Sequence, residues 1–317
     1  MLSLSKNKNL LFYGASLIGS SHIKKGSVCQ DSNKAFRLSN GWHVAAVADG
    51  VGSAKHSEIA SKLAVDTVVE ICNDRINKHT KFSELQSIIL DAYKDAEKRI
   101  EDYADQQGDS ITEYDTTLSM VIYDGEKIAY GHSGDGGIVG LSVNGEYLKI
   151  TNPQKAEDNI CVIPLRAGEQ HWVIGACEER LASVLLATDG IYDTFFPYLL
   201  RGQEVEVYVP LIRFFMDNNC MEINDENLAD IEKSRIEFLQ SPAYSSVTDD
   251  KTVLVVFNQK IMPSIKEESY YAEPNWEKLQ LEWNKKAYPH LYKDVQENDA
   301  IQPEKVEPSE DADTGDE

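Results

Sequence analysis

Four aspartates at the ends of apolar segments carry the strongest chemical signal in this chain. They are Asp31, Asp49, Asp189 and Asp249. Asp49 and Asp189 each follow a run of apolar residues directly, and Asp249 shortly precedes another such run. Magnesium and manganese ions prefer carboxylate, carbonyl and water oxygens over nitrogen or sulfur. If these strand ends converge, the side chains would form the divalent-cation centre of a metal-dependent hydrolase.

The net charge limits the partners that such a centre can have. The chain has a formal charge of -22 at pH 7. Binding to nucleic acid or to an anionic membrane needs clustered lysines and arginines, so neither partner is expected. A phosphorylated substrate would also be repelled, unless bound divalent cations reverse the sign of the local field.

Length and composition indicate a globular protein. The 317 residues, 42% of them hydrophobic, suffice for one large domain or two ordinary ones. No stretch approaches the roughly 18 uncharged apolar residues of a membrane span, and the first residues lack the apolar centre of a secretory signal. We therefore expect a cytoplasmic protein. The five cysteines are scattered and odd in number, so we expect reduced and mostly buried thiols.

Two segments show the spacing of helices that face a core. Residues 55–74 and 82–104 each place apolar side chains on one face. Strands are expected before them, at Leu10–Ile18 and Trp42–Ala48, with a polar loop over residues 20–29. These features place the first two aspartates between strands and helices.

The second half of the chain returns to strands. Asp124-Gly125 and Asn144-Gly145 are tight-turn dipeptides, which predict an antiparallel meander over residues 116–150. Further strands are expected at about 171–176, 183–188 and 252–258, with helical material between 191 and 240. The order of elements predicts an α+β fold in which two sheets pack together under a cover of helices.

Composition divides the chain into three parts, namely a domain over residues 1–259, an aromatic segment over 260–297 and an acidic tail over 298–317. The aromatic segment contains Trp276, Leu279, Trp283 and Tyr288, which suit either a helix docked on the domain or a segment that binds a partner protein. The tail has the charge of a disordered, solvated segment.

Several short motifs together carry a resemblance to a known family. An Asp-Gly pair alone is weak evidence, because it is also ordinary turn chemistry. The motifs, in order, are Ser21-His22-Ile23-Lys24-Lys25-Gly26 leading to Gln30-Asp31, Ala48-Asp49-Gly50-Val51-Gly52, Asp115-Thr116-Thr117, Gly134-Asp135-Gly136, Thr188-Asp189-Gly190 leading to Asp193, and Thr248-Asp249-Asp250. This series resembles the type 2C metal-dependent serine/threonine protein phosphatases (the PPM family), most closely their prokaryotic branch, over about residues 10–258.

The resemblance implies a β-sandwich of two antiparallel sheets flanked by paired α-helices, with two Mn²⁺ or Mg²⁺ ions in a cleft at one end. Asp49 would bridge both ions, Gly50 would offer its carbonyl, Asp189 and Asp249 would bind the ion opposite Gly50, and Asp31 would act through water. Asp135 with Asp189 would hold a weaker third ion, and Asp193 would contribute through water.

The same resemblance implies hydrolysis of phosphoserine and phosphothreonine by direct attack of a metal-bridging hydroxide, with Asp49 and Asp189 catalytic through the ions. The substrate would be a phosphorylated protein, with a cognate serine/threonine kinase. Motifs of the covalent routes, Cys-x5-Arg and Asp-x-Asp-x-Thr, do not occur in the chain.

Two departures from the family pattern concern proton donation and phosphate binding. Val51 stands where well-studied relatives have a histidine that protonates the leaving group, so metal-bound water would have to supply that proton. The family's phosphate-binding arginine is also missing, and His22 or Lys25 is the expected substitute; simple solvated loop charges are the alternative.

Four other residues receive structural roles. His56 is expected at a helix start, in a surface or capping role. Thr116 and Thr117 are assigned to packing and hydrogen bonding, and His132 to a satisfied position in the core.

Two alternative functions stay open at this point. One is a pseudophosphatase that binds a protein partner with little turnover, and the other is a metallophosphatase for a small phosphomonoester. The presence of Asp49, Asp189 and Asp249 favours an active enzyme.

Overall fold

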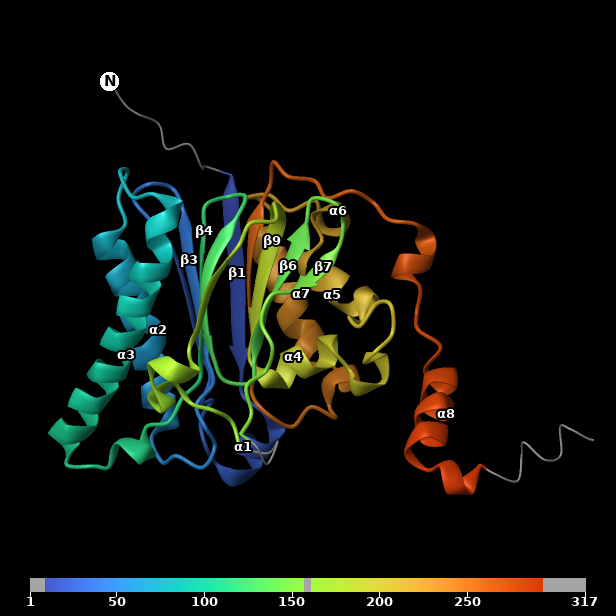
Figure 1. Cartoon of the computed structure of the whole chain (residues 1–317), viewed down its shortest axis with the longest axis horizontal. Helices are drawn as coiled ribbons and strands as arrows, with labels where there is room; N and C mark the ends of the chain where they lie inside the picture. Colours follow the sequence, from blue (N-terminus) through green and yellow to red (C-terminus); the bar gives the residue numbers. More distant parts are fainter. Residues whose placement is uncertain (1–8, 157–160, 293–317) are drawn as a thin grey trace, which may run out of the picture.

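Two five-stranded antiparallel sheets form the centre of the molecule (Figure 1). The computed structural model describes residues 9–156 and 161–292. The first sheet has the order β1-β10-β9-β6-β7 and the second β2-β3-β4-β5-β8. The strands of the first sheet are β1 (Leu10–Leu17), β6 (Gly137–Ser142), β7 (Tyr147–Lys149), β9 (Leu181–Ala187) and β10 (Lys251–Asn258). Those of the second are β2 (Ser32–Arg37), β3 (His43–Ala48), β4 (Leu118–Tyr123), β5 (Ile128–Ser133) and β8 (Val173–Cys177).

Helices cover the outer face of each sheet. The long helices α2 (Ser57–Arg75) and α3 (Leu85–Gln107) lie against the second sheet. The first sheet is covered by α4 (Asp189–Phe195), α5 (Val209–Met216) and α7 (Leu228–Gln240), with the short α6 (Asn218–Met221) beside them. The arrangement confirms the predicted α+β sandwich with flanking helices.

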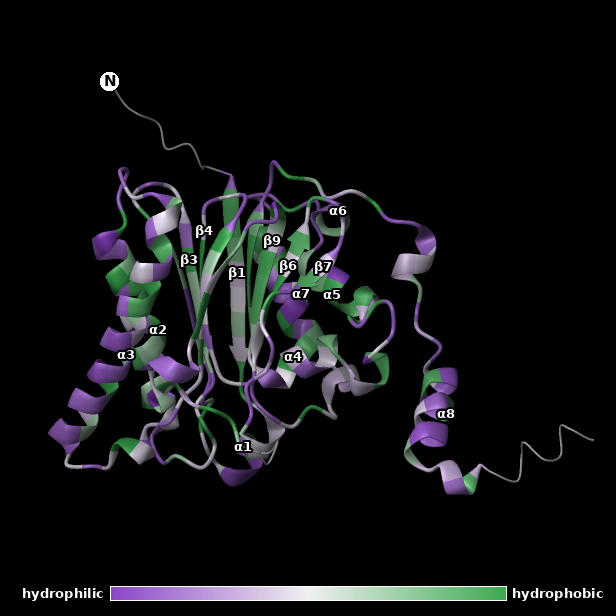
Figure 2. Ribbon diagram, viewed as in Figure 1, coloured by the Kyte–Doolittle hydropathy of each residue, from purple (hydrophilic) through white to green (hydrophobic). Residues whose placement is uncertain are grey.

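Three hydrophobic clusters hold these layers together. The middle one lies between the two sheets and includes Val47, Val121, Leu186 and Leu254, all at most 2% exposed. The outer two lie between each sheet and its helices. In Figure 2 the strands β6 and β9 are hydrophobic along much of their length, as expected for strands covered on both faces. The strand ends are thereby fixed rigidly, which is what a site built on them requires.

Three expectations about local structure were wrong. Residues 116–150 do not form one meander, because β4 and β5 pair in one sheet and β6 and β7 in the other. The chain crosses between the sheets at residues 134–136. The expected polar loop contains the short helix α1 (Ser20–Lys25). Among the cysteines, which form no disulfide in the described ranges, Cys72 alone is buried, while Cys161 and Cys220 are exposed.

The C-terminal segment has two parts that contact the domain differently. Residues 259–272 pack on the sandwich. Ile261 is 6% exposed, the Tyr270 ring stacks on Tyr147, and Tyr271 lies 4.0 Å from the Arg213 guanidinium. The helix α8 (Trp276–Ala287) lies at the edge of the molecule and buries none of its residues (Figure 1).

Aromatic side chains make the contacts between α8 and the domain. The Trp276 ring is 5.2 Å from that of Tyr208, and the Trp283 ring is 5.5 Å from that of Tyr198. Nowhere in residues 9–156 and 161–292 does a helix have the length and apolar character needed to cross a membrane.

Truncation tests where the folded domain ends. We expect the free energy of unfolding of a chain of residues 1–272 to lie within about 1 kcal/mol of that of the full chain, because none of the residues of α8 is buried. A chain of residues 1–258 should lose about 3 kcal/mol or more, because Ile261, Tyr270 and Tyr271 no longer cover the sandwich. Urea unfolding followed by circular dichroism measures both values. Equal stability of the two truncated chains would support the boundary predicted after residue 259.

Candidate active site

Three carboxylates from different elements meet at one end of the sandwich. Asp49 follows β3 in one sheet, Asp189 follows β9 in the other, and Asp135 lies where the chain crosses between the sheets. Each offers a carboxylate oxygen, and these oxygens all lie within 4.8 Å of one another. Residues that are far apart in the sequence therefore form one acidic cluster.

Hydrogen bonds from a neighbouring segment fix the backbone of Asp49. The Asp49 carbonyl accepts bonds from the Thr117 amide at 2.8 Å and from the Thr116 hydroxyl at 2.9 Å. The Asp49 amide donates to the Thr117 hydroxyl at 2.9 Å. The two threonines thus have the hydrogen-bonding role predicted for them, and the group they hold is the backbone of the central aspartate.

Asp31 lies beside this cluster at the start of β2 and is 7% exposed. The Thr188 hydroxyl donates to its Oδ2 at 2.8 Å, so the residue before Asp189 holds the carboxylate of Asp31. The other oxygen, Oδ1, is buried and has no hydrogen-bond partner. Asp189 Oδ1 is in the same condition.

Two glycines allow the close backbone approaches that the cluster needs. A Cβ at Gly50 would lie 2.7 Å from the Gln30 carbonyl oxygen, and one at Gly190 would lie 2.1 Å from the Asp250 carbonyl oxygen. Any larger residue would push apart the segments that carry Asp31, Asp49 and Asp189.

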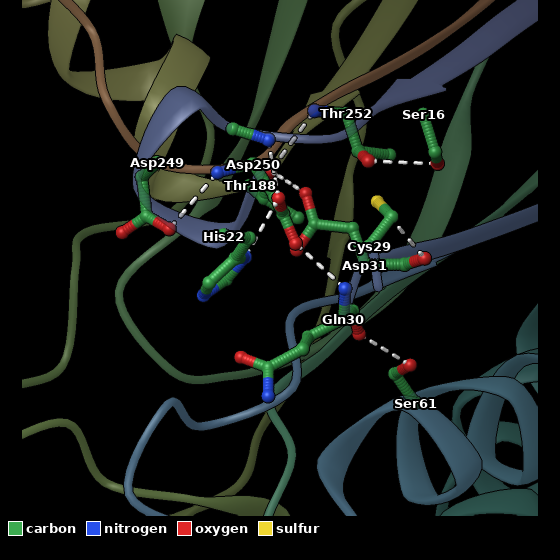
Figure 3. A network of polar contacts seen from close by, with 11 residues as sticks. Ser16, His22, Cys29, Gln30, Asp31, Ser61, Thr188, Asp249, Asp250 and Thr252 are labelled. Atoms are coloured by element: carbon green, nitrogen blue, oxygen red, sulfur yellow. Dashed lines mark hydrogen bonds and ion pairs between the residues drawn. The ribbon is translucent and has the colours of Figure 1, made fainter. Parts of the chain in front are cut away.

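Asp249 and Asp250 are neighbours with different surroundings. Successive side chains of an extended segment point to opposite sides, so only one of them can face the solvent-exposed end of the cluster. Asp249 is exposed, and its charge raises the pKa of Asp189, which places it near that residue. Asp250 is 3% exposed and points into the protein (Figure 3).

The Asp250 carboxylate binds three donors from the segment that contains α1. Its Oδ1 accepts the Gly19 amide at 2.6 Å and lies 2.9 Å from Nδ1 of His22, while its Oδ2 accepts the Gln30 amide at 2.6 Å. Asp250 is not among the site residues predicted from the sequence. The available signal was the pair of adjacent acids before a strand, of which one must face inward.

The contacts continue from Gln30 to the loop after Asp49. The Gln30 carbonyl accepts the Gly50 amide at 3.1 Å. It also accepts the Ser61 hydroxyl of α2 at 2.6 Å (Figure 3). Asp250 is therefore connected through Gln30 to Gly50, and one network holds the segments on both sides of the acidic cluster.

A second ion pair supports the same loop from the other side. Arg166 binds the Asp115 carboxylate with two guanidinium nitrogens, Nη2 at 2.8 Å from Oδ2. The Asp115 carbonyl accepts the Val51 amide at 3.0 Å. Arg166 lies in a region with no recognisable motif, so the sequence offered no signal for it.

Burial and mutual repulsion shift the acids of the cluster toward the protonated form. Burial raises the pKa of Asp31 to about 7 and, together with the charges of Asp135 and Asp249, that of Asp189 to about 6. Burial also raises the pKa of Asp49 well above its usual range, and the charges of Asp31 and Asp189 raise it further. Bringing these groups together as carboxylates thus costs free energy unless cations neutralise them.

The donor set fits divalent cations of the magnesium type. All of its side-chain donors are carboxylates, and the buried oxygens Asp31 Oδ1 and Asp189 Oδ1 lack partners. Hard cations coordinate such oxygens, and their positive charge offsets the repulsion among the carboxylates. Lys155 offsets part of the charge, with its Nζ 3.6 Å from Asp135 Oδ2.

The residues predicted to contact phosphate lie on α1. His22 is buried and its Nδ1 is engaged by Asp250, whereas Lys25 is exposed. Asp193 lies one turn after Asp189 in α4, and its charge raises the pKa of Asp135 and of Asp189. Their roles toward substrate or metal stay predictions.

His132 and His56 have the structural positions expected for them. His132 is fully buried between the Ser119 hydroxyl, 2.8 Å from its Nδ1, and the Asn152 carbonyl, 3.1 Å from its Nε2. Burial lowers the pKa of His132 to about 4. His56 precedes α2 at its N-cap, but its side chain makes no capping hydrogen bond.

A family model described as protein phosphatase 2C matches residues 18–231, about two thirds of the chain. The chain belongs to the protein phosphatase 2C family. It is accordingly an enzyme of the protein serine/threonine phosphatase class. A comparison with curated protein sequences finds no significant match.

Solved structures of bacterial phosphatases share the fold of this phosphatase. Stp1 from Staphylococcus aureus is 13% identical, with 81% of this chain and 98% of that chain covered and a TM-score of 0.56. PstP/Ppp from Mycobacterium tuberculosis is 17% identical, with 80% of this chain and 99% of that chain covered and a TM-score of 0.55. The catalytic domain of PstP, solved in complex with two manganese ions, is 18% identical, with 78% of this chain and 97% of that chain covered and a TM-score of 0.53. At these identities the likeness concerns the fold.

Manganese should stabilise this phosphatase more at high pH than at low pH. Without metal, the raised pKa values of Asp31 and Asp189 give stability that is present below their unfolded values and is lost as the pH rises through about 6 to 7. Cations bind the ionised forms. Metal at about a hundred times its Kd should therefore add about 2.7 kcal/mol at pH 8, and clearly less at about pH 5.

Thermal unfolding with excess MnCl₂ or with EDTA, at the two pH values, measures this difference. The Asp49→Asn variant serves as the control and should lose most of the response to metal. An equal rise of Tm at both pH values would contradict the prediction.

Asp250→Asn should destabilise the fold even without metal. An amide has a single acceptor oxygen, so one of the buried amides of Gly19 and Gln30 would lose its partner, at a cost of about 1–3 kcal/mol. The matched control is Asp249→Asn, the same change on the exposed neighbour, which should leave the stability of the metal-free protein nearly unchanged. Urea unfolding in EDTA compares them, and equal free energies of unfolding would refute the role of Asp250.

Proposed function

We propose that this phosphatase hydrolyses phosphoserine and phosphothreonine in proteins with two Mn²⁺ or Mg²⁺ ions held by the acidic cluster. The observation that carries the proposal is the convergence of Asp49, Asp135 and Asp189 within 4.8 Å, beside buried carboxylate oxygens that have no partner in the protein. The PstP catalytic domain, which has a similar fold, has been solved in complex with two manganese ions.

The residues take the roles that the family pattern gives them. Asp49 lies centrally and would contact both ions, with the Gly50 carbonyl beside it. Asp189 and Asp249 would bind the ion opposite Gly50, and Asp31 would act through water. Asp135 faces Asp189 within the cluster, where the two would hold a weaker third ion. When bound, the ions supply an activated water as nucleophile and offset charge on the phosphoryl oxygens.

The chain's own contribution is to hold these carboxylates ready. Thr116 and Thr117 fix the backbone of Asp49, and the Thr188 hydroxyl orients Asp31. Because these contacts come from rigid strand ends, the geometry is largely set before an ion or a substrate arrives. Val51 has no proton to donate, so the protonation of the leaving group does not come from that position.

The phosphate group would be contacted from α1. Asp250 holds the His22 ring through Nδ1, so Nε2 is the nitrogen that can face a phosphoryl oxygen. Lys25 is exposed three residues later and can act as a point charge, though not as a bidentate fork. Both are proposed as phosphate contacts in a chain that is otherwise strongly acidic.

The proposed function also implies a class of substrate, a partner enzyme and a location. The substrate would be a phosphoprotein made by a cognate serine/threonine kinase, in the cytoplasm. The aromatic segment around α8 is the part of the chain that we propose for contacts with a partner protein, since its Leu281, Trp283 and Tyr288 are between 39% and 47% exposed.

Substitution of the central acids tests the proposed chemistry. Asp49→Asn and Asp189→Asn should reduce phosphate release from a phosphothreonine peptide to background, because each removes a charge that holds an ion. Asp74→Asn, near the far end of α2, is the control and should keep full activity. Malachite-green detection of phosphate, with MnCl₂ or EDTA, measures turnover.

The outcomes separate the alternatives. Turnover that survives EDTA, or that survives both substitutions, would contradict the proposal. Manganese-dependent hydrolysis of an aryl phosphate without hydrolysis of the peptide would support a metallophosphatase for small phosphomonoesters. Metal binding without any turnover would support a pseudophosphatase that acts as a binding module.

A further inference from the structure

A second group of metal-ligating side chains lies at the start of α2, apart from the acidic cluster. Of the described residues, His56, Asp109 and Glu113 form this group, which we call the His56 cluster. One donor atom from each lies within 4.8 Å of the others. His56 Nε2 is 3.6 Å from Asp109 Oδ2 and 3.9 Å from Glu113 Oε2.

The three residues come from separate segments that the fold brings together. His56 directly precedes α2. The helix α3 ends at Gln107, and its C-cap Gly108 has a left-handed conformation (φ 76°) that turns the chain, so that Asp109 lies at the end of the helix. Glu113 closes the 3-10 turn Ile111–Glu113. The cluster therefore depends on the tertiary structure and not on a local sequence motif.

One donor of the His56 cluster lacks a hydrogen-bond partner, and another is oriented by a neighbouring residue. The Oε2 atom of Glu113 is buried and accepts no hydrogen bond, while the Glu113 side chain as a whole is 38% exposed. The Tyr114 hydroxyl donates to Asp109 Oδ2 at 2.9 Å, and the Tyr114 ring lies 5.0 Å from the His56 ring at an interplanar angle of 30°. Contacts of this kind orient metal ligands in known sites.

The nearest competing cation is weakly held. Lys55 Nζ is 3.8 Å from Glu113 Oε2, but the Lys55 side chain is 66% exposed. A solvated ion pair at this distance contributes little free energy, so a divalent cation can displace the lysine at small cost.

We propose that the His56 cluster binds a transition-metal dication such as Zn²⁺. One imidazole nitrogen and two carboxylates form a donor set that zinc accepts, with water completing the coordination. Magnesium prefers oxygen alone, so the site differs in selectivity from the all-carboxylate cluster. The inference concerns a separate site and does not rest on the proposed chemistry of the phosphatase.

The position of the His56 cluster indicates what a bound ion would do. The His56 amide donates to the Glu113 carbonyl at 2.8 Å, the Val51 amide to the Asp115 carbonyl at 3.0 Å, and the Thr117 amide to the Asp49 carbonyl at 2.8 Å. These bonds join two segments, with Asp49 at one end and the His56 cluster at the other. An ion there would link the start of α2 to the segment that positions Asp49.

Zinc titration of the full-length chain tests the proposal. The chain would carry Asp49→Asn and Asp189→Asn, so that the acidic cluster no longer competes for metal. We expect one equivalent of Zn²⁺ by isothermal titration calorimetry. Adding His56→Ala or Glu113→Gln should weaken the affinity by about tenfold or more, since changes even beyond the ligands of metal sites have effects of that size. His79→Ala, at an exposed histidine, is the control and should change nothing.

A spectroscopic measurement keeps the test independent of variant stability. With Cu²⁺ as the probe, electron spin echo modulation from the remote nitrogen of a coordinating imidazole should appear, and it should vanish in His56→Ala while persisting in His79→Ala. The proposal is overturned if zinc does not bind, if it binds equally in the His56→Ala and Glu113→Gln variants, or if no imidazole modulation is seen. None of these outcomes depends on whether the acidic cluster is catalytic.

Discussion

Mutual repulsion among buried carboxylates is the constraint on which the rest of the structure depends. Asp31, Asp49 and Asp189 are brought together at the end of the sandwich, where burial raises the pKa of each. Without a counter-charge this arrangement opposes folding, so the remaining structure must supply the free energy that holds it. The three hydrophobic clusters between the layers provide that support, because they fix the strands whose ends carry the acids. Because the repulsion among these carboxylates raises the free energy of the metal-free fold, cation binding, which removes that repulsion, lowers it.

The backbone around the site is held by polar groups that do not belong to the acidic cluster. Asp250 binds the segment before Asp31, Thr117 binds the backbone of Asp49, and Arg166 binds Asp115 behind the same loop. Each of these contacts joins segments far apart in the sequence, so the precision of the site is a tertiary property. At Val51 the supporting contact is made by the backbone, because its amide donates to the Asp115 carbonyl at 3.0 Å. The geometry of this loop therefore depends on backbone contacts and not on the side chain of Val51.

The acidity of this phosphatase affects how a substrate can bind. A net charge of -22 opposes the approach of a phosphorylated protein, and the compensation must be local. Under the proposed function, cations bound at the acidic cluster would provide it, together with His22 and Lys25 on the helix α1. The His56 cluster is a second place where acids lie close together, here with an imidazole. Under both proposals, bound cations would link the electrostatics of the chain to its folding.

The sequence alone determined the elements and the identity of most acids in the site. Apolar periodicity located the helices and strands, and Asp-Gly pairs at strand ends marked Asp49 and Asp189, because these patterns are local. The tertiary structure decided how the elements combine: β6 and β7 join the opposite sheet from β4 and β5, which places Asp135 at the crossing point. It also decided that Asp250 faces inward while Asp249 does not, that Arg166 pairs with Asp115, and that His56, Asp109 and Glu113 lie together. Such pairings join residues across long sequence separations, and no local pattern encodes them.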